Sequence, residues 1–331
     1  MDKSMRTVQD LDGTSINPVA DIGLASVGLE GLVGRKILIA VSGGVDSTTT
    51  AVLLRTAGAD GTHLMINTGF LRQDEPAAPV LDLEAAGLRV EVVDERQRFH
   101  EALQGKKTGG ERRDAFRDLY FDVLADFMRV RDIDVIAQGT QFHQIVAKQA
   151  HNEPTRRFLD NKFEVVEPVA GLTKSQIRVL ARALGVPDNC VTRRPFPGPG
   201  LILRFGGEYT REKLELIRAA THVVDTFVHQ HAEDFTECYQ IFPYLTDQEP
   251  VTYVDHSGAG SYGAVLLLRA VREEFHGRTI VYRPFTVPDR LSGGLVERLM
   301  AIPGIARVCW DLTPKFGSGV DVAPGATIEY A

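Results

Sequence analysis

The stretch from Lys36 to Thr48, KILIAVSGGVDST, constrains the fold of this chain more than any other. It opens with the short apolar run 37–41, which Ser42-Gly43-Gly44 follows at once. That combination predicts a strand that is buried on both faces and ends in a tight turn. The residues from Thr48 to Ala57 then continue as a helix. A strand, a glycine-rich turn and a helix start therefore follow one another directly.

This arrangement is suited to binding phosphate. Gly43 and Gly44 let the backbone approach an anion closely, and the first N–H groups of the helix point at it with the helix dipole behind them. Ser42 and Ser47 add hydroxyl donors, and Asp46 is placed to hold a Mg²⁺ ion that bridges phosphate oxygens. The alternative interpretation is a tight turn capped by Asp or Ser. The string lacks Gly-Lys-Ser/Thr and GxGxxG, so it is neither a Walker loop nor a dinucleotide fingerprint.

Strands and helices alternate as far as residue 200. The predicted strands are 37–41, 62–67, 88–94, 133–137 and 164–168, and the predicted helices are 48–57, 77–86, 111–131 and 173–184, with a short helix within 19–33 before them. This alternation predicts an α/β fold with a doubly wound parallel sheet, whose ligands lie at the carboxyl ends of the strands. Asn67-Thr68-Gly69 and Gln138-Gly139-Thr140 also follow strands, so one site can collect all three turns.

The pattern changes after the proline- and glycine-rich stretch 193–201, RRPFPGPGL. That stretch is either a linker or a stiff loop that presents N–H groups and two arginines to a phosphate. One long helix, 210–228, follows it. Short strands and one or two helices come next: 239–245, 251–254, 264–268, 280–284, 291–301, 306–312 and 327–330. We therefore predict three parts: a loose N-terminal arm over 1–22, an α/β domain over 23–200 and a smaller, antiparallel α+β domain over 201–331.

Composition narrows the class of protein. The net charge of −7 argues against broad nucleic-acid binding, and 44% hydrophobic with 24% charged residues is ordinary for a globular chain. No apolar stretch reaches the length of a membrane span and the N-terminus lacks an apolar signal core, so we expect a cytoplasmic protein without a membrane partner. Cys190, Cys238 and Cys309 lie far apart and favour neither a zinc site nor a disulfide framework.

Several separated motifs resemble one family. SGGVDST resembles the SGGxDS loop of the ATP pyrophosphatases, which cleave ATP to AMP and pyrophosphate. Together with NTGFLR at 67–72, QGT at 138–140, RPFPGPGL at 194–201 and the terminal TIEYA, it resembles the synthetase part of GMP synthetase over roughly residues 30 to 331. That part joins an adenine nucleotide α-hydrolase-like domain to a C-terminal dimerisation domain. The glutamine amidotransferase half is missing, as in versions of the enzyme where it is a separate subunit.

The resemblance implies roles for individual residues. ATP would be bound by Ser42, Gly43, Gly44, Val45, Asp46 and Ser47, with adenine near Asn67 and Gly139. Asp46 would hold Mg²⁺, and Asp46, Lys148 and Lys174 would be catalytic. The purine nucleotide, XMP or a GMP-like substrate, would be bound by Arg194, Pro195, Gly198, Gly200, Lys315, Thr327, Ile328 and Glu329. The implied reaction is adenylation of XMP with release of pyrophosphate, then displacement of AMP by ammonia to give GMP. The implied partners are a second copy of the chain and a separate glutamine amidotransferase subunit.

The chain departs from the family pattern over the reacting centre. Asn67 stands where the family usually has Asp, and only Lys148, His151 and Asn152 match the usual lid, IKSHHN. At the C-terminus, 323–325 reads Ala-Pro-Gly instead of Lys-Pro-Pro, and Ala331 replaces an acidic residue.

These departures keep two other hypotheses open. One is a tailoring enzyme that adenylates a purine nucleotide and transfers sulfur or another nucleophile. It would use Cys190 as an accessible thiolate beside Arg193-Arg194, whereas the alternative for Cys190 is a packed core residue. The other hypothesis is a non-catalytic nucleotide-binding homologue. The complete loop 42–47 argues against it, and the thinned lid argues for it.

Overall fold

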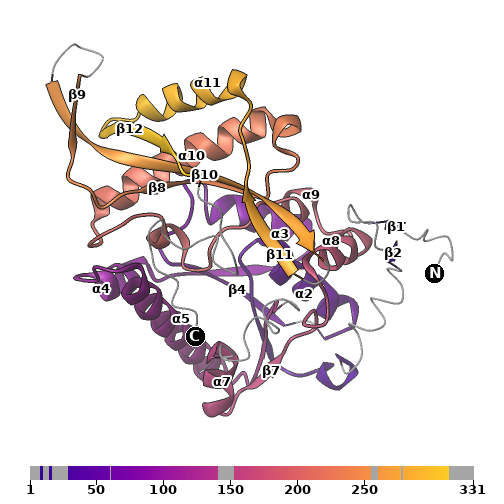
Figure 1. Cartoon of the computed structure of the whole chain (residues 1–331). Coiled ribbons are helices and arrows are strands. Elements are labelled where there is room, and N and C mark those ends of the chain that lie inside the picture. Colours follow the sequence, from indigo (N-terminus) through magenta and orange to yellow (C-terminus); the bar gives the residue numbers. More distant parts are fainter. Residues whose placement is uncertain are drawn as a thin grey trace. The chain divides into compact units, whose positions relative to one another are not determined.

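The computed structural model describes residues 8–9, 15–16, 29–59, 61–140, 153–254, 260–276 and 279–312 (Figure 1). The chain divides into two compact units, each with segments that are distant in sequence. Unit 1 comprises Met1–Asn67, Asp74–Glu95 and Leu119–Arg193, and unit 2 comprises Thr68–Gln73, Arg96–Asp118 and Arg194–Ala331. The predicted domain boundaries at residues 22 and 200 stay predictions.

The described part of unit 1 contains a five-stranded sheet with the order β5-β4-β3-β6-β7. All of its pairings are parallel, which confirms the predicted α/β class. Its strands are β3 (Ile37–Ala40), β4 (Thr62–Asn67), β5 (Val90–Asp94), β6 (Val135–Ala137) and β7 (Glu164–Val166). The central strand β3 is apolar throughout because both of its faces are covered: Ile37, Leu38 and Ile39 are at most 1% exposed.

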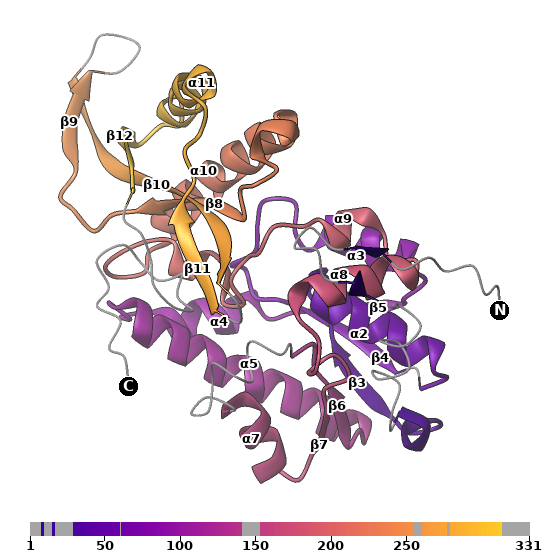
Figure 2. The same cartoon turned by 45° about the vertical axis from the view of Figure 1, so that its right-hand side comes forward.

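Helices cover both faces of this sheet (Figures 1 and 2). On one side lie α2 (Val45–Thr56), α8 (Lys174–Ala183) and α9 (Asp188–Val191), with α3 (Ala77–Ala85) packed against α9. On the other side lie α7 (Glu153–Asp160) and the unit 1 part of α5 (Gly109–Arg131). The core between β3 and the first group includes side chains of α2, α8 and α9.

Helix α2 carries three consecutive threonines, Thr48, Thr49 and Thr50, that are fully buried. The hydroxyl of Thr48 donates to the Gly44 carbonyl (2.9 Å) and that of Thr49 to the Val45 carbonyl (2.6 Å). These bonds satisfy two hydroxyls inside the core, so the helix can bury polar residues directly behind the glycine turn.

Several boundaries match the sequence predictions. Strand β4 spans the predicted residues 62–67. Helix α8 begins after Thr173, whose hydroxyl accepts from the Gln176 N–H while the Gln176 side chain accepts from the Thr173 N–H. Helix α2 instead begins at Val45, three residues before the predicted Thr48, because Gly44 takes the N-cap position. The sequence patterns did not predict α7, α9 or α4 (Arg96–Leu103).

Three short elements of the described chain precede the sheet of unit 1. Strands β1 (Val8–Gln9) and β2 (Ser15–Ile16) pair antiparallel with each other. The 3-10 helix η1 (Leu29–Leu32) lies near the end of the helix predicted within 19–33, and residues 17–28 lie outside the described part of the chain.

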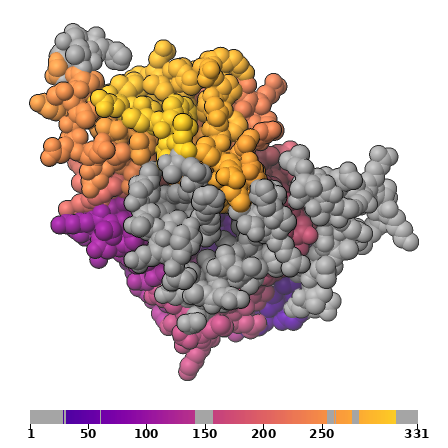
Figure 3. Space-filling model, viewed as in Figure 1, coloured from indigo at the N-terminus to yellow at the C-terminus, as the bar shows by residue number. Residues whose placement is uncertain are grey.

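Unit 2 is built around one long strand, β10 (Gly260–His276). Its partners are β8 (Gln240–Leu245), β9 (Val251–Val254), β11 (Thr279–Pro284) and β12 (Ile305–Trp310). The helical elements of this unit are α4, the first part of α5, η2 (Gly200–Leu203), α10 (Arg211–Gln230), η3 (Ala232–Phe235) and α11 (Asp289–Met300). The yellow residues of α11 and β12 form part of the face shown in Figure 3.

The antiparallel prediction for unit 2 is confirmed for β8, β9 and β11 and wrong for β12, which pairs parallel with β10. Between β10 and β12 the chain passes through β11 and α11. A connection of this length permits β12 to run parallel to β10. Strand β10 is also much longer than the predicted 264–268, because its charged second half pairs with β11. The predicted strand 327–330 lies outside the described residues.

None of the helices that the structure describes has an apolar stretch of the length that a bilayer requires.

Candidate active site

The glycine turn lies at the carboxyl end of β3 and leads into α2. Gly43 has a φ of +70°, a conformation that favours glycine. A Cβ atom there would lie 2.6 Å from Pro79 Cβ and 2.7 Å from Arg193 Nη1. Gly44 is the N-cap of α2, and among the described residues no side chain caps this helix through that position. The first N–H groups of α2 are therefore left for a ligand.

The two serines of the turn hold its shape. The Ser42 N–H donates to Ser47 Oγ (3.2 Å), and the Ser47 hydroxyl donates to the Gly44 carbonyl (3.3 Å). The hydroxyl oxygens of Ser42 and Ser47 lie 3.4 Å apart. Val45, also predicted to bind ATP, is only 2% exposed and packs into the core, so its N–H is the group it can offer.

Asp46 and Lys174 form an ion pair at the start of α2. Lys174 Nζ lies 2.6 Å from Asp46 Oδ2, and about a quarter of each side chain is exposed. The other carboxylate oxygen, Asp46 Oδ1, is buried and has no hydrogen-bond partner among the described residues. The first residue of α8 and the second residue of α2 thus bring one positive and one negative group together beside the turn.

Gly139 follows β6 and lies against the backbone of α2. A Cβ atom at Gly139 would lie 2.8 Å from both the Asp46 carbonyl carbon and the Ser47 nitrogen, closer than real Cβ contacts. The predicted turn 138–140 therefore supports the start of α2 directly. Its Thr140 hydroxyl donates to Glu167 Oε1 (2.6 Å), which links this turn to the chain after β7.

Asp46 fits the predicted role of a magnesium ligand. Its carboxylate oxygen Oδ1 is buried beside the phosphate turn and has no hydrogen-bond partner among the described residues, so it is available to a cation. Among the described residues there is no group of three or more His, Cys, Asp or Glu side chains that could hold a metal. One carboxylate with phosphate and water oxygens is a common set for Mg²⁺, which dehydrates reluctantly.

Arg193 contacts the same turn and pairs with Glu75. The sequence pointed to Arg193 as one of two arginines for a phosphate, and it did not point to Glu75. Arg193 Nη1 donates to the Ser42 carbonyl (3.3 Å), and Arg193 Nη2 pairs with the Glu75 carboxylate. Two adjacent arginines indicate phosphate binding, but the sequence does not show that the side chain of Arg193 donates to a backbone carbonyl.

Cys190 lies inside the core of unit 1. It is 1% exposed and belongs to the cluster that joins α2, α8 and β3. Burial raises the pKa of the Cys190 thiol, a nearby Asp82 adds to that rise, and a hydrogen bond with Thr48 and the charge of Arg193 oppose it. The accessible thiolate that sulfur transfer requires is therefore absent at this position, and packing is the role that the structure supports.

The remaining predicted residues of the site are Asn67 and a group outside the described part of the chain. Asn67 ends β4, the strand next to β3, and its carbonyl accepts from the Glu95 N–H (3.0 Å). Several predicted site residues lie outside the described part of the chain: Lys148, Lys315, Thr327, Ile328 and Glu329. Their roles stay predictions.

The predicted substrate loop, residues 194–200, belongs to unit 2. Arg194 Nη2 donates to the Phe235 carbonyl (3.1 Å), and Arg194 Nε is buried without a partner among the described residues. Burial lowers the pKa of Arg194, while Cys238 and Asp225 oppose that change. The Pro195 carbonyl accepts from Gln240 Nε2 (2.9 Å), and Gly198 is exposed with open space around it.

Gly200 closes this loop with a φ of +72°. A Cβ atom at Gly200 would collide with the carbonyl oxygen of Phe70, which accepts instead from the Leu201 N–H (2.8 Å). Two arginines hold neighbouring backbone. Arg112 donates to the carbonyls of Ile202 and Phe205, and Arg218 donates to those of Gly69 and Leu71. Sequence reasoning missed both arginines, because each is one of several charged residues in its helix and nothing in the local pattern distinguishes it from the others.

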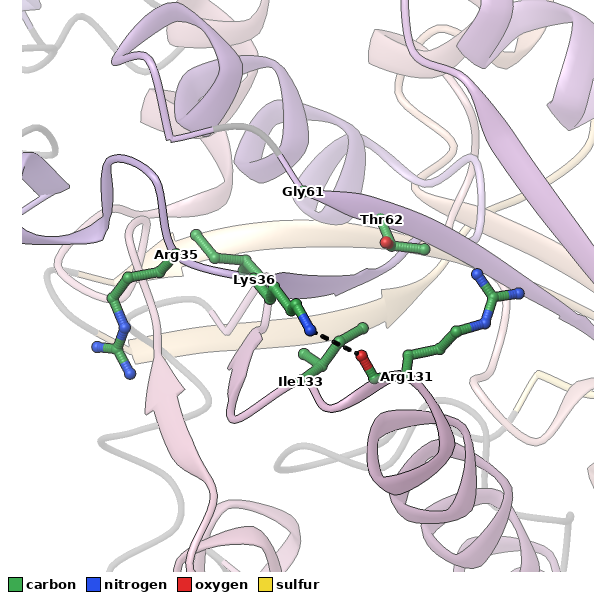
Figure 4. Close-up of a pocket in the computed structure, with 7 residues that line it drawn as sticks. Arg35, Lys36, Gly61, Thr62, Arg131 and Ile133 are labelled. Atoms are coloured by element: carbon green, nitrogen blue, oxygen red, sulfur yellow. Dashed lines mark hydrogen bonds between the residues drawn. The ribbon is translucent and has the colours of Figure 1, made fainter.

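A pocket of about 450 Å³ lies at the opposite, amino end of the unit 1 sheet (Figure 4). It is lined by Arg35, Lys36, Ile37, Gly61, Thr62, Arg131 and Ile133. Each cation among them faces a carboxylate: Arg35 pairs with Asp134 and Glu164, Lys36 with Asp132 and Arg131 with Glu91. Lys36 Nζ also points at the Arg131 carbonyl. Such paired charges do not favour a polyphosphate, so the pocket is a poor nucleotide site.

Comparison with known proteins decides the family. A protein from Methanopyrus kandleri that is named as a subunit of glutamine-hydrolyzing GMP synthase is 36% identical over 312 residues, which cover 89% of this chain and 93% of that protein. The chain belongs to the GMP synthase family. A longer glutamine-hydrolyzing GMP synthase from Thermus thermophilus is 34% identical over 307 residues, and this chain covers 58% of it. The chain thus matches the GMP synthase subunit over nearly its whole length and the longer GMP synthase over little more than half.

Two further comparisons add nothing to that result. No family model matches the chain. A solved structure of NMN synthetase from Francisella tularensis is similar with a TM-score of 0.45 and 17% identity, over 56% of this chain and 78% of that one, which is too weak a likeness to support a conclusion.

Proposed function

We propose that the chain is the synthetase subunit of a two-subunit GMP synthase, a ligase that uses ATP to convert XMP to GMP. One observation carries the proposal. The turn 42–44 leads into the N-terminus of α2, where the N-cap residue Gly44 has no side chain to cap the helix, beside Asp46, Lys174 and Gly139. The chain that carries this turn covers 93% of a GMP synthase subunit. The turn supplies donors for phosphates, and the family supplies the reaction class.

The proposed reaction has two steps. The oxygen on carbon 2 of the XMP base attacks the α-phosphorus of ATP, an oxygen–phosphorus bond forms, and the bond to pyrophosphate breaks. Ammonia then adds to carbon 2, loses a proton, and AMP departs with the former XMP oxygen to leave GMP. The carbonyl oxygen is a poor leaving group and AMP is a good one, so adenylation makes the displacement feasible.

The residues of unit 1 have clear proposed roles. The N–H groups of residues 43–47 and the hydroxyls of Ser42 and Ser47 would bind ATP phosphates, and Gly139 keeps the start of α2 in place. The ammonium group of Lys174 would move from Asp46 to phosphate oxygens, which frees the carboxylate for a cation. Mg²⁺, when bound, would neutralise charge on the departing pyrophosphate, and Asp46 is the residue proposed to hold it. Adenine would lie near Asn67 and Gly139.

For the purine nucleotide we propose residues of unit 2. Arg194 would bind the XMP phosphate, with Pro195, Gly198 and Gly200 shaping the loop around it. The buried Arg194 Nε has no hydrogen-bond partner among the described residues, so this donor would be available to the XMP phosphate. Lys315 and the segment Thr327-Ile328-Glu329 would complete the site, and Lys148 would act over the reacting atoms.

The proposal also includes partners and location. The ammonia would come from a separate glutamine amidotransferase subunit, because the relatives' names include glutamine hydrolysis and the relatives of matching length are named as one subunit of the enzyme. We also propose that two copies of the chain form a homodimer and that the protein is located in the cytoplasm. The burial of Cys190 argues against sulfur transfer, and no described contact favours a non-catalytic homologue.

The test is pyrophosphate release from ATP and Mg²⁺ with XMP, with and without an ammonium salt. Release that depends on XMP, with GMP formed only when ammonium is present, is the expected result. Release with XMP but no amination under saturating ammonium would contradict ammonia as the nucleophile. No release with XMP, GMP or IMP would contradict the enzymatic proposal altogether.

A further inference from the structure

We propose that Arg193 is a positioning residue for the phosphate turn, and that Glu75 holds Arg193 in the orientation this task requires. The inference rests on the proposed function in one respect, that the turn 42–47 binds the phosphates of ATP. It assigns a role to Arg193, which contacts a backbone carbonyl, and to Glu75, which pairs with Arg193.

The contacts all lie within unit 1. Arg193 Nη1 donates to the carbonyl oxygen of Ser42 at 3.3 Å, and Arg193 Nη2 pairs with Glu75. The side chains are 18% and 7% exposed, so the pair is largely removed from water. A Cβ atom on Gly43 would lie only 2.7 Å from Arg193 Nη1, which places the guanidinium directly against the turn.

The contact between Arg193 and the Ser42 carbonyl also determines the orientation of the Gly43 N–H. The C=O of Ser42 and the N–H of Gly43 belong to the same planar, trans peptide and point in opposite directions. A donor that holds the carbonyl toward Arg193 therefore holds the Gly43 N–H away from it. If this peptide rotated, a carbonyl oxygen would replace an N–H donor in a loop that must attract an anion. A cationic donor on the carbonyl also polarises the peptide, which strengthens its N–H as a donor.

Glu75 explains why Arg193 holds a carbonyl when a phosphate would offer it more charge. The fork of a guanidinium lets one nitrogen donate to a carboxylate while another donates to a second acceptor. Glu75 immediately precedes Pro76, the N-cap of α3, and a Cβ atom on Gly43 would lie 2.6 Å from Pro79 of that helix. The segment 75–79 therefore contributes both the carboxylate that pairs with Arg193 and a proline that packs close to Gly43.

The neighbouring residue, Arg194, has different contacts from Arg193, and we infer different roles for the two arginines. Arg194 belongs to unit 2, donates to the Phe235 carbonyl and keeps a buried Nε without a described partner. Arg193 is the last residue of unit 1 and has its guanidinium between a carbonyl and a carboxylate. Of the two adjacent arginines, Arg194 is the one with an unused donor for a ligand, and Arg193 acts through the backbone.

The experiment compares Arg193→Gln, Glu75→Gln and the double variant. We expect Arg193→Gln to raise the KM and the dissociation constant for ATP about ten- to a hundredfold, the range of a lost hydrogen bond to a charged group, and to change the KM for XMP less than about threefold. Glu75→Gln should raise the KM for ATP by a smaller factor, since its amide oxygen still accepts. The double variant should match Arg193→Gln in its KM for ATP, because the role proposed for Glu75 is to hold Arg193.

The matched control is Arg35→Gln, which removes another arginine from a carboxylate pair at the far end of the same sheet. It should leave the KM for ATP unchanged. ATP binding by calorimetry at a temperature where each variant is folded separates positioning from unfolding. If Arg193→Gln does not fold, Arg193→Lys replaces it in the test. This variant keeps one cationic donor, so we expect a smaller rise in the KM for ATP.

Two results would overturn the inference. An unchanged ATP dissociation constant in Arg193→Gln would show that the turn does not need this contact. An effect of equal size on XMP and ATP would show general loosening of unit 1. Failure of the proposed function is distinguishable, because a wild-type protein that binds ATP without acting on XMP still permits the ATP-binding comparison. A wild-type protein that binds no ATP would contradict both.

Discussion

The two ends of the unit 1 sheet differ in how their polar groups are used. At the amino end, about 450 Å³ of open space is lined by cations that already face carboxylates. At the carboxyl end, the turn 42–44 leads to the first N–H groups of α2, and the N-cap residue Gly44 has no side chain to cap them. One carboxylate oxygen of Asp46 there has no hydrogen-bond partner among the described residues. A polyphosphate requires unused donors and close backbone approach. The comparison shows that hollow space alone does not identify such a site.

The largest effect is expected from Gly139→Ala. The new methyl group would meet backbone atoms of Asp46 and Ser47 at 2.8 Å and displace the start of α2. We expect XMP-dependent pyrophosphate release to fall about a hundredfold or more, since small displacements of positioning groups have effects of this size. The free energy of unfolding should fall by about 1–3 kcal/mol.

Gly171→Ala is the matched control for that prediction. Gly171 also belongs to unit 1, but a Cβ atom there would meet nothing within 4 Å. Steady-state rates and urea unfolding of both variants give the comparison. Equal behaviour of the two alanine variants would show that the carboxyl end does not depend on close approach.

The next effect concerns the charges beside the turn. Asp46→Asn removes the carboxylate proposed to hold Mg²⁺ and leaves Lys174 without its partner at 2.6 Å. We expect turnover to fall about a hundredfold and the Mg²⁺ concentration for half-maximal rate to rise. Pyrophosphate release is measured across a Mg²⁺ titration. A variant with the wild-type Mg²⁺ dependence would contradict the role given to Asp46.

Cys190→Ala should have a modest effect that separates packing from chemistry. Removing the sulfur atom from the core should lower the free energy of unfolding by about 1 kcal/mol, while turnover stays within about twofold of wild type. Loss of turnover in a folded variant would revive the sulfur-transfer hypothesis. Steady-state assays and urea unfolding, run side by side, are the measurements.

The same residue gives a pH dependence. Burial raises the pKa of Cys190 above its ordinary value of 9.0, so the unfolded chain loses this proton at lower pH than the folded one. The free energy of unfolding should therefore fall as the pH rises above 9.0, by less than about 1.4 kcal/mol for each pH unit. Urea titrations at about pH 8 and about pH 10, on either side of that value, should show a smaller fall in Cys190→Ala. An identical fall in both proteins would contradict the assignment.

The smallest effect is expected at the amino end. Arg35→Gln breaks contacts with Asp134 and Glu164 that are partly exposed, and such exposed pairs contribute little to stability. Turnover and the KM for ATP should not change. A rise in the KM for ATP would show that the pocket at this end takes part in nucleotide binding.

Local sequence patterns predicted much of unit 1. Strand β3 follows from its apolar run, and the start of α8 follows from Thr173 and Gln176, because these signals depend on neighbouring residues alone. Asp46, Lys174 and Gly139, which the sequence analysis named together with the turn 42–47, lie close to that turn at the carboxyl end of the sheet, and their roles stay predictions.

Tertiary contacts decided the rest. Segments 68–73 and 96–118 join unit 2 because they pack there, which no local pattern reveals. The parallel pairing of β12 depends on the path of α11. Arg193 turns toward Ser42 because Glu75, more than a hundred residues earlier, holds it there. Long-range partners of this kind cannot be read from one sequence.

The most direct test of the account follows one atom. XMP labelled with ¹⁸O on carbon 2 is incubated with ATP, Mg²⁺, an ammonium salt and the protein, and the products are analysed by mass spectrometry. The account predicts GMP, pyrophosphate and AMP whose phosphate carries the label. Unlabelled AMP, or ADP and inorganic phosphate as the products of ATP, would contradict it.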